Sequence, residues 1–340
     1  MDFTTVRLKD LIVHQVGLKD REEALHISDS PLAVTGGLSA ELIPFFLRRF
    51  EFAYEQYRFE NPAEFPNNVL AAVKQLFEYP QVMPAASEVI ARCLYDAVTH
   101  PKVKPGELVV ARFEDYPFDG RTVRAVGIFK MENKSKFLEV LRPDDRAPSG
   151  LAIREGVDML KTDKGCLVLE AESENGFVVL LTDPNNRGTE ARYWKESFLG
   201  LRQRSTNYSQ TNSVLSATRE FVSEAGESME PKEKMELLSR SVSWFQDREV
   251  FNQQEFEQEV FQDAEKIQSF RQYARERAPE FKEEFDISAP AVKKQARVFK
   301  SVLKLDRNFH IYIHGNRELI QRGVEPDGRK FYKIYFSEES

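Results

Sequence analysis

Two histidines four residues apart, near the end of this 340-residue sequence, are the first side chains whose types and spacing suggest chemistry. On a helix, His310 and His314 would lie one turn apart on the same face and could bind one metal ion. On a strand, they would lie roughly 13 Å apart, too far to share an ion. The stretch FHIYIHG alternates apolar and polar residues, which is the period of a strand. We therefore place both histidines on the outer face of a strand and expect no zinc site or other metal site.

The sequence does not match the known catalytic and nucleotide-binding motifs considered below. The Gly36-Gly37 pair precedes a predicted helix, but it lacks the further glycines and the lysine of a phosphate-binding loop. Pro143-Asp144-Asp145 is similar to the start of a metal-dependent nuclease motif, but the following GLAIREGVD lacks the required acidic residue two positions before a lysine. No GxSxG or HExxH motif and no Cys–His arrangement is found. The sequence therefore predicts no catalytic residues, no cofactor and a protein that is not an enzyme.

A row of basic residues late in the chain has the spacing of one helix face. Its members are separated by 4, 3 and 4 positions: Lys293, Arg297, Lys300 and Lys304. An adjacent apolar row has the same spacing and would hold the helix against a core: Val292, Ala296, Phe299 and Leu303. The pattern predicts a helix over residues 289–303 that turns its positive row outward.

Further basic residues extend this predicted surface beyond the helix. They follow it in the chain or lie on a predicted hairpin: Arg307, Arg329, Lys330 and Lys333. A contiguous cationic surface suits the phosphate groups of DNA, whose binding requires positive charge rather than a particular base edge. The sequence leaves open a second interpretation, a solvated helix face whose charges pair with an acidic segment or with another chain.

Charge is segregated along the chain, although its net value is −7. Residues 218–286 carry 10 basic and 18 acidic side chains, whereas residues 291–333 carry 11 basic and 4 acidic side chains. Local potential, rather than net charge, decides where a polyanion binds. The sequence has only two cysteines, no apolar run of bilayer length and no apolar leader, which indicates a cytoplasmic protein without disulfides.

The first half of the sequence is typical of an α+β fold. Residues 4–16 read as a strand with an irregularity near Asp10, and a short strand follows around ALHIS. Three helices are predicted next, over residues 39–57, 67–78 and 85–99. Five strand candidates with short links follow: ELVVARFEDY, TVRAVGIFKME, KFLEVLR, CLVLEAE and FVVLLTD. These elements predict an amino-terminal antiparallel sheet with helices on one face.

The second half is predicted to be mainly helical and to end in a β-hairpin. The helices are expected at residues 212–225, 231–247, 253–277 and 289–303, with a break near Asp263. FHIYIHG is expected to pair with RKFYKIYF in a hairpin with an elaborate tip, the long excursion GNRELIQRGVEPDG, which ends in the turn residues Pro-Asp-Gly. The polar stretch LRQRSTNYSQTN marks the boundary between an α+β domain, 1–205, and a helical domain with a terminal hairpin and a basic surface, 206–340.

Two segments resemble one bacterial family. ARYWKESFLGLRQRSTNYSQTNSVL and LKLDRNFHIYIHGNRELIQRGVEPDGRKFYKIYF are similar to the nucleoid-associated proteins called NdpA, and the order of the elements also matches. The resemblance spans most of the chain. It implies association with the bacterial chromosome, DNA binding, a location in the cytoplasm at the nucleoid, and self-association as a homodimer. It supplies no catalytic residues.

Two hypotheses follow from these observations. The first is a non-enzymatic, nucleoid-associated protein that binds DNA, most naturally double-stranded, through phosphate contacts with little sequence preference. Its DNA-binding residues would be Lys293, Arg297, Lys300, Lys304, Arg307, Arg329, Lys330 and Lys333. The alternative is a protein-interaction module that uses the acidic segment 218–286 to dock a DNA-handling enzyme or a defence-system partner.

Overall fold

The computed structural model describes most of the chain. The residues that it describes are 3–60, 67–98, 103–142, 149–159, 163–183, 193–224, 229, 231–277, 281–298, 301–305, 309–313 and 320–336. Contacts divide the chain into two compact units, Met1–Arg204 and Ser205–Ser340.

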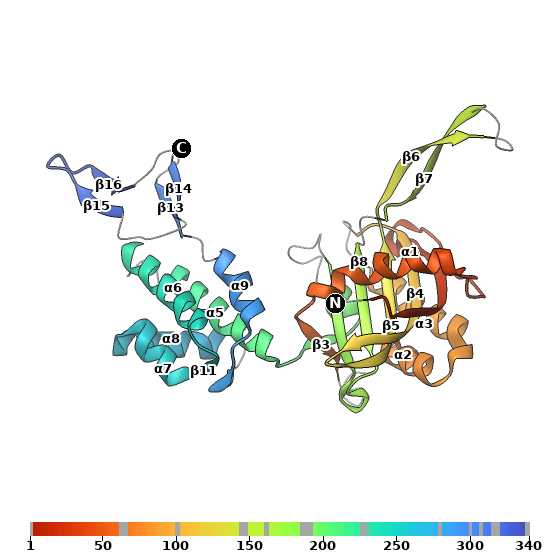
Figure 1. The fold of residues 1–340 in the computed structure, drawn as a ribbon, viewed down its shortest axis with the longest axis horizontal. Coiled ribbons are helices and arrows are strands. Elements are labelled where there is room, and N and C mark those ends of the chain that lie inside the picture. Colours follow the sequence, from red (N-terminus) through yellow and green to blue (C-terminus); the bar gives the residue numbers. More distant parts are fainter. Residues whose placement is uncertain are drawn as a thin grey trace. The chain divides into compact units, whose positions relative to one another are not determined.

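An eight-stranded antiparallel sheet forms the centre of the first unit, in the order β10-β3-β9-β8-β5-β4-β1-β2 (Figure 1). Its strands are β1 (Arg7–Val16), β2 (Leu25–His26), β3 (Gln56–Phe59), β4 (Gly106–Phe118), β5 (Arg121–Met131), β8 (Lys164–Leu169), β9 (Val178–Thr182) and β10 (Leu201–Gln203). One extra residue interrupts β1 between Leu8 and Asp10, which confirms the irregularity predicted there. Asp119 and Gly120 join β4 to β5 with positive φ angles of 50° and 71°, as a two-residue hairpin turn requires.

Helices cover both faces of this sheet. Side chains alternate along each strand, so Val110 and Ile128 pack against α2 (Asn68–Glu78) and α3 (Met83–Ala97) on one face. On the opposite face, α1 (Gly36–Leu47) packs Phe46 against Phe129, with ring centroids 4.4 Å apart. The prediction that all the helices lie on one face is therefore wrong, although the α+β class is confirmed.

The first predicted helix is also shorter than expected. In place of one helix over residues 39–57, α1 ends at Leu47 and a 3-10 helix, η2 (Arg48–Phe52), follows. The chain then enters the sheet as β3, where Tyr57 pairs with both β9 and β10. Pairing on both sides satisfies the backbone of this segment, and that tertiary context overrides the helical pattern.

A separate two-stranded ribbon projects from the first unit (Figure 1). It consists of β6 (Lys134–Leu141) and β7 (Gly150–Val157), which pair only with each other among the described strands. We call this ribbon the arm. The sequence predicted β6 as a strand but did not predict β7.

A buried network of charges lies where the arm leaves the sheet. Lys130 and Lys164 are directly opposed on β5 and β8, and both are buried. Glu132 Oε1 lies 3.0 Å from Lys130 Nζ, and Asp183 Oδ1 lies 3.3 Å from Lys164 Nζ, so each lysine has a carboxylate. Asp163 accepts hydrogen bonds from the backbone N–H groups of Glu132 and the next residue. The network thus fixes the turn that leads into β6.

The second unit is a helical bundle with two terminal hairpins. Its helices are α5 (Asn207–Glu224), α6 (Pro231–Gln246), α7 (Gln253–Phe261), α8 (Ala264–Arg277) and α9 (Ala289–Val298), with a small ladder of β11 (Val250–Asn252) and β12 (Glu284–Asp286). An aromatic core joins them, with Trp244, Phe251 and Phe256 in mutual ring contact. The break predicted near Asp263 is confirmed, because Asp263 Oδ1 caps the start of α8.

The carboxy-terminal hairpins correct two predictions. The helix predicted over residues 289–303 ends at Val298, and residues 301–305 form the strand β13 (Ser301–Leu305). This strand pairs with β14 (Phe309–Ile313), whereas β15 (Ile320–Val324) pairs with β16 (Lys330–Ile334). FHIYIHG therefore pairs with the preceding strand and not with RKFYKIYF. A short connection lets the two strands form their backbone hydrogen bonds with each other at a small cost in chain entropy. Pairing across the expected long excursion would cost more, because a longer loop has to be closed.

Candidate nucleic-acid interface

The helix α9 is held against the bundle by one buried face. Ala291 and Val292 are buried, and α9 packs against α5 and α6. Gln295 is also buried, and its Nε2 donates to Asn212 Oδ1 at 2.6 Å and to Ser216 Oγ at 2.9 Å. Specific hydrogen bonds therefore add to apolar contact in fixing the rotation of α9, and the opposite face remains in solvent.

Two of the predicted basic residues lie together on that exposed face. Lys293 and Arg297 are one helical turn apart, and both are exposed. Neither forms an ion pair with a carboxylate of any described residue. Their positive charges are thus available to an external anion.

Lys293 and Arg297 border a hollow of about 560 Å³ on the surface of the bundle. The hollow has an apolar floor, formed by Phe245, Ile287, Ala289, Val292 and Ala296. Arg248 and Glu249 complete its charged lining, so that three cations face one carboxylate. The site is positive on balance, and its floor offers apolar contact as well.

Arg248 is the cation of this hollow that the sequence interpretation missed. It lies before β11, far from α9 in sequence, in a segment whose overall charge is acidic. Its guanidinium lies 4.5 Å from the centroid of the Trp244 ring and its Nη2 lies 2.6 Å from Glu259. Arg248 is therefore anchored by a cation–π contact and an ion pair, and part of its charge is already compensated.

The other predicted residues do not extend the same row. Lys304 lies on β13 opposite His310, because the chain has left the helix by that point. Lys300 and Arg307 lie outside the described residues. The expected stripe of four basic residues is therefore established only for Lys293 and Arg297.

The basic residues of the last hairpin are exposed but are not all alike. Arg329 lies 2.7 Å from Asp327, so its charge is partly compensated. Lys330 and Lys333 stand three positions apart on β16 and therefore point to opposite faces of the strand. Lys333 Nζ lies 4.9 Å from the Tyr335 ring centroid. These residues can contact an anion, but Lys330 and Lys333 cannot both lie on one face of the hairpin.

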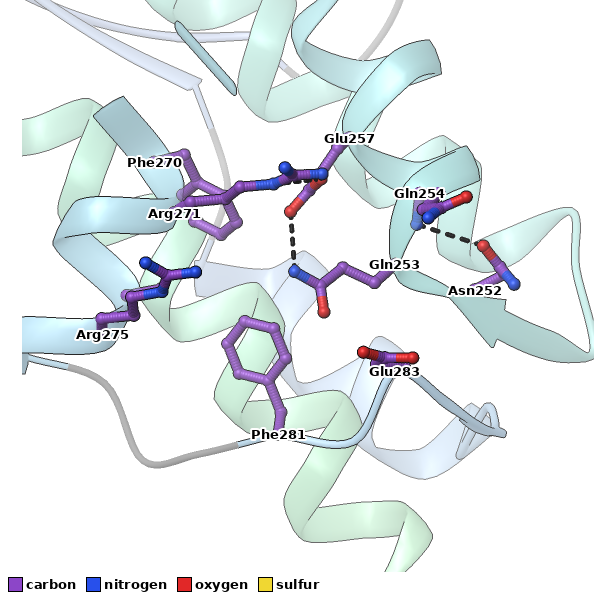
Figure 2. Close-up of a pocket in the computed structure, with 10 residues that line it drawn as sticks. Asn252, Gln253, Gln254, Glu257, Phe270, Arg271, Arg275, Phe281 and Glu283 are labelled. Carbon is purple, nitrogen blue, oxygen red and sulfur yellow. Dashed lines mark hydrogen bonds and ion pairs between the residues drawn. The ribbon is translucent and has the colours of Figure 1, made fainter. Parts of the chain in front are cut away.

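A second hollow, of about 880 Å³, lies between α7, α8 and the segment before β12 (Figure 2). Its centre is Glu257, whose side chain is buried and accepts hydrogen bonds from Arg271 at 2.5 and 2.8 Å and from Gln253 at 2.8 Å. Arg275 and Phe281 also line it. Because Arg271 balances the charge of Glu257, this hollow is polar but not strongly positive, and it suits a polyanion less well than the surface of α9.

The described part of the chain contains no recognisable metal-binding site. No group of three or more His, Cys, Asp or Glu side chains is placed there to hold a metal ion. His310 lies on β14, as the alternating pattern predicted, whereas His314 lies outside the described residues. Within the same part of the chain, none of the helices has the length and apolar character that crossing a bilayer requires.

Comparison with known proteins identifies one family. The family model described as nucleoid-associated protein YejK matches residues 12–329 of this sequence. The match covers most of the sheet, the arm, the helical bundle and the first strand of the last hairpin, β15. A search of curated proteins found no match.

Proposed function

This chain belongs to the YejK family of nucleoid-associated proteins, and we propose that it binds double-stranded DNA through the phosphate backbone. The observation that carries the proposal is the pair Lys293 and Arg297, exposed on one face of α9 and without an ion pair to any described carboxylate. Long cationic side chains on a rigid helix can reach phosphates of one strand. Location in the cytoplasm, at the nucleoid, follows from the same role.

Sequence preference is expected to be weak. Phosphate contacts fix the position of a protein on a duplex but carry no base information. The exposed face of α9 offers lysine and arginine, not an Asn or Gln placed to read an adenine edge. Arg329, Lys330 and Lys333 on the last hairpin would add contacts of the same kind, as would Lys300, Lys304 and Arg307. The proposed role requires no catalysis.

A double charge reversal tests the assignment of the site. We expect Lys293→Glu with Arg297→Glu to weaken binding by about tenfold or more on every duplex sequence, since two phosphate contacts are lost and replaced by repulsion. The measurement is fluorescence anisotropy with two duplexes of unrelated sequence and equal length.

The matched control is Arg275→Glu with Lys282→Glu. Both residues are exposed in the same unit, and the change in net charge is identical. If the control weakened binding as much as the α9 pair, overall charge rather than this surface would govern the interaction. Loss confined to one of the two duplexes would contradict the proposal that binding is nonspecific.

The acidic segment supports the alternative function only weakly. Several of its carboxylates form ion pairs within the unit: Glu220 with Arg219, Glu224 with Arg277, Glu233 with Lys266, Glu257 with Arg271 and Glu259 with Arg248. Internal pairing reduces the charge available to a basic partner, so the protein-docking role is the second choice. Self-association as a homodimer is part of the proposal and is compatible with either role.

A further inference from the structure

The hollow beside α9 combines two kinds of surface. Its floor is apolar, and its edge carries three cations and one carboxylate: Arg248, Lys293, Arg297 and Glu249. The phosphate groups of DNA would use the cations but would leave the floor of this hollow, of about 560 Å³, in contact with water. A segment that carries both an apolar anchor and negative charges would use the whole site, because it covers the floor and pairs with the edge.

The last five residues of the sequence have this composition. Phe336 follows the final strand, β16, and is 69% exposed. The four residues after it are Ser-Glu-Glu-Ser, which carry two negative charges and no positive one. We call residues 336–340 the tail. The preceding Tyr335 is held by the hairpin, because its hydroxyl donates to Gln321 Oε1 at 3.0 Å. Phe336 is therefore an exposed aromatic side chain directly beside an acidic pair.

The pairing of the two last hairpins leaves only a short path along the chain between α9 and the tail. β14 ends at Ile313, opposite Ser301, which comes three residues after the end of α9. β16 ends at Ile334, opposite Ile320. Each hairpin thus returns the chain to its own base, and residues 314–319 join the two bases. A short tether gives a segment an effective concentration of about 1 mM, which is enough to fill a weak site.

We propose that the tail binds in this hollow and competes there with DNA. Phe336 lies on the apolar floor, and Glu338 and Glu339 pair with the two exposed cations of α9. In an extended segment Phe336 and Glu338 lie on the same side, about 7 Å apart, so that they can reach the floor and its edge together. This inference rests on the DNA-binding role of α9 and adds its regulation. The tail and the phosphates require the same cations, so binding of one excludes the other.

The affinity of the full chain for a duplex at fixed salt tests the competition. An effective concentration of about 1 mM and a tail dissociation constant of about 0.1 mM would lower the apparent affinity for DNA about tenfold. Phe336→Ala should therefore raise the affinity by about three- to tenfold, although the net charge is unchanged. Val324→Ala is the matched control, because Val324 is an apolar residue of the same hairpin that is 61% exposed. It should have no effect, and an equal gain in the two variants would overturn the proposal.

Removal of the negative charges of the tail should act in the same direction. We expect Glu338→Gln with Glu339→Gln to raise the affinity for DNA by about threefold or more, because the tail no longer pairs with the cations. The control is Glu265→Gln with Glu276→Gln, which removes the same charge from exposed positions of α8. Equal gains in the two double variants would show that overall charge governs the affinity, and the proposed tail contact would be wrong.

A measurement without DNA tests the hollow directly. The fluorescently labelled peptide YFSEES, residues 335–340, is titrated with the full chain carrying Phe336→Ala, up to about 0.5 mM, and its anisotropy is followed. We expect a dissociation constant of about 0.1 mM, and Ala296→Gln in the same chain should raise it about fivefold or more, since a polar side chain then lies on the apolar floor.

The peptide measurement separates this inference from the DNA-binding role. The same peptide with its own Phe336→Ala change keeps both glutamates, and it should bind at least about fivefold more weakly because the anchor is lost. Absence of peptide binding in a chain that binds DNA would overturn the tail contact and leave the α9 proposal intact. Peptide binding by a chain that does not bind DNA would support the tail contact and contradict the DNA-binding role alone.

Discussion

His14 is a buried side chain whose protonation is controlled by the fold. It is 1% exposed, its Nδ1 accepts a hydrogen bond from Ser28 N–H at 3.1 Å, and its Nε2 has no partner among the described residues. Burial lowers the pKa of His14 below its ordinary value of 6.5, while the charge of Glu88 opposes this effect. The folded protein therefore keeps His14 neutral where the unfolded chain begins to bind a proton.

A pH dependence of stability follows from His14. Below pH 6.5 the unfolded chain binds a proton that the folded chain does not, so the free energy of unfolding falls as the pH falls from 6.5 toward the lowered pKa. We expect His14→Phe to reduce this slope, and His26→Gln, at an exposed histidine, to leave it unchanged. Urea denaturation at several pH values provides the measurement. An unaltered slope in His14→Phe would contradict this account of the buried imidazole.

The sequence could predict some individual positions and not others. Four residues are about one helical turn, so the shared face of Lys293 and Arg297 followed from spacing alone. Arg248 could not be predicted as their neighbour, because it comes from an acidic segment and reaches the hollow only through tertiary packing. The opposition of Lys130 and Lys164 was likewise invisible, since it depends on the register of β5 against β8.

Among the elements, α2 depends on one side chain at its start. Asn67 caps the helix by accepting from Leu70 N–H at 3.0 Å, and its Nδ2 donates to Leu199 O at 2.8 Å. We expect Asn67→Ala to lower the free energy of unfolding by about 1–2 kcal/mol, because both hydrogen bonds are lost. Asn68→Ala, at the exposed first residue of the helix, should change it by less than about 0.5 kcal/mol. Equal effects in urea denaturation would show that the cap has no special role.

Strands that border a core were predicted better than strands that do not. The sheet is buried on both faces by helices. For this reason, the sequences of its strands either alternate between apolar and polar residues or are continuously apolar, as in β4, β5, β8 and β9. β7 was missed because a ribbon in solvent is not forced into that pattern. β13 was mistaken for helix because a short run such as SVLKL fits either period, and only its pairing with β14 decides.

For the chain as a whole, the segregation of charge and the family resemblance predicted more about function than the local sequence patterns did. The family match over residues 12–329 confirms the expected nucleoid-associated family. The acidic and basic segments both lie in the second unit. Several of its acidic side chains are neutralised by ion pairs, whereas Lys293 and Arg297 form none with a described carboxylate. The exposure of apolar side chains on the arm could not be predicted, because it depends on the absence of a third strand among the described elements.

The most direct test of the central claim is the salt dependence of binding to a generic duplex. If Lys293 and Arg297 supply even two phosphate contacts, the affinity should fall by about tenfold or more between 50 and 200 mM salt, because counterions are released on binding. The double reversal of these residues should reduce the slope of log K against log salt by about 2. An affinity that did not change over this range would contradict phosphate binding by α9.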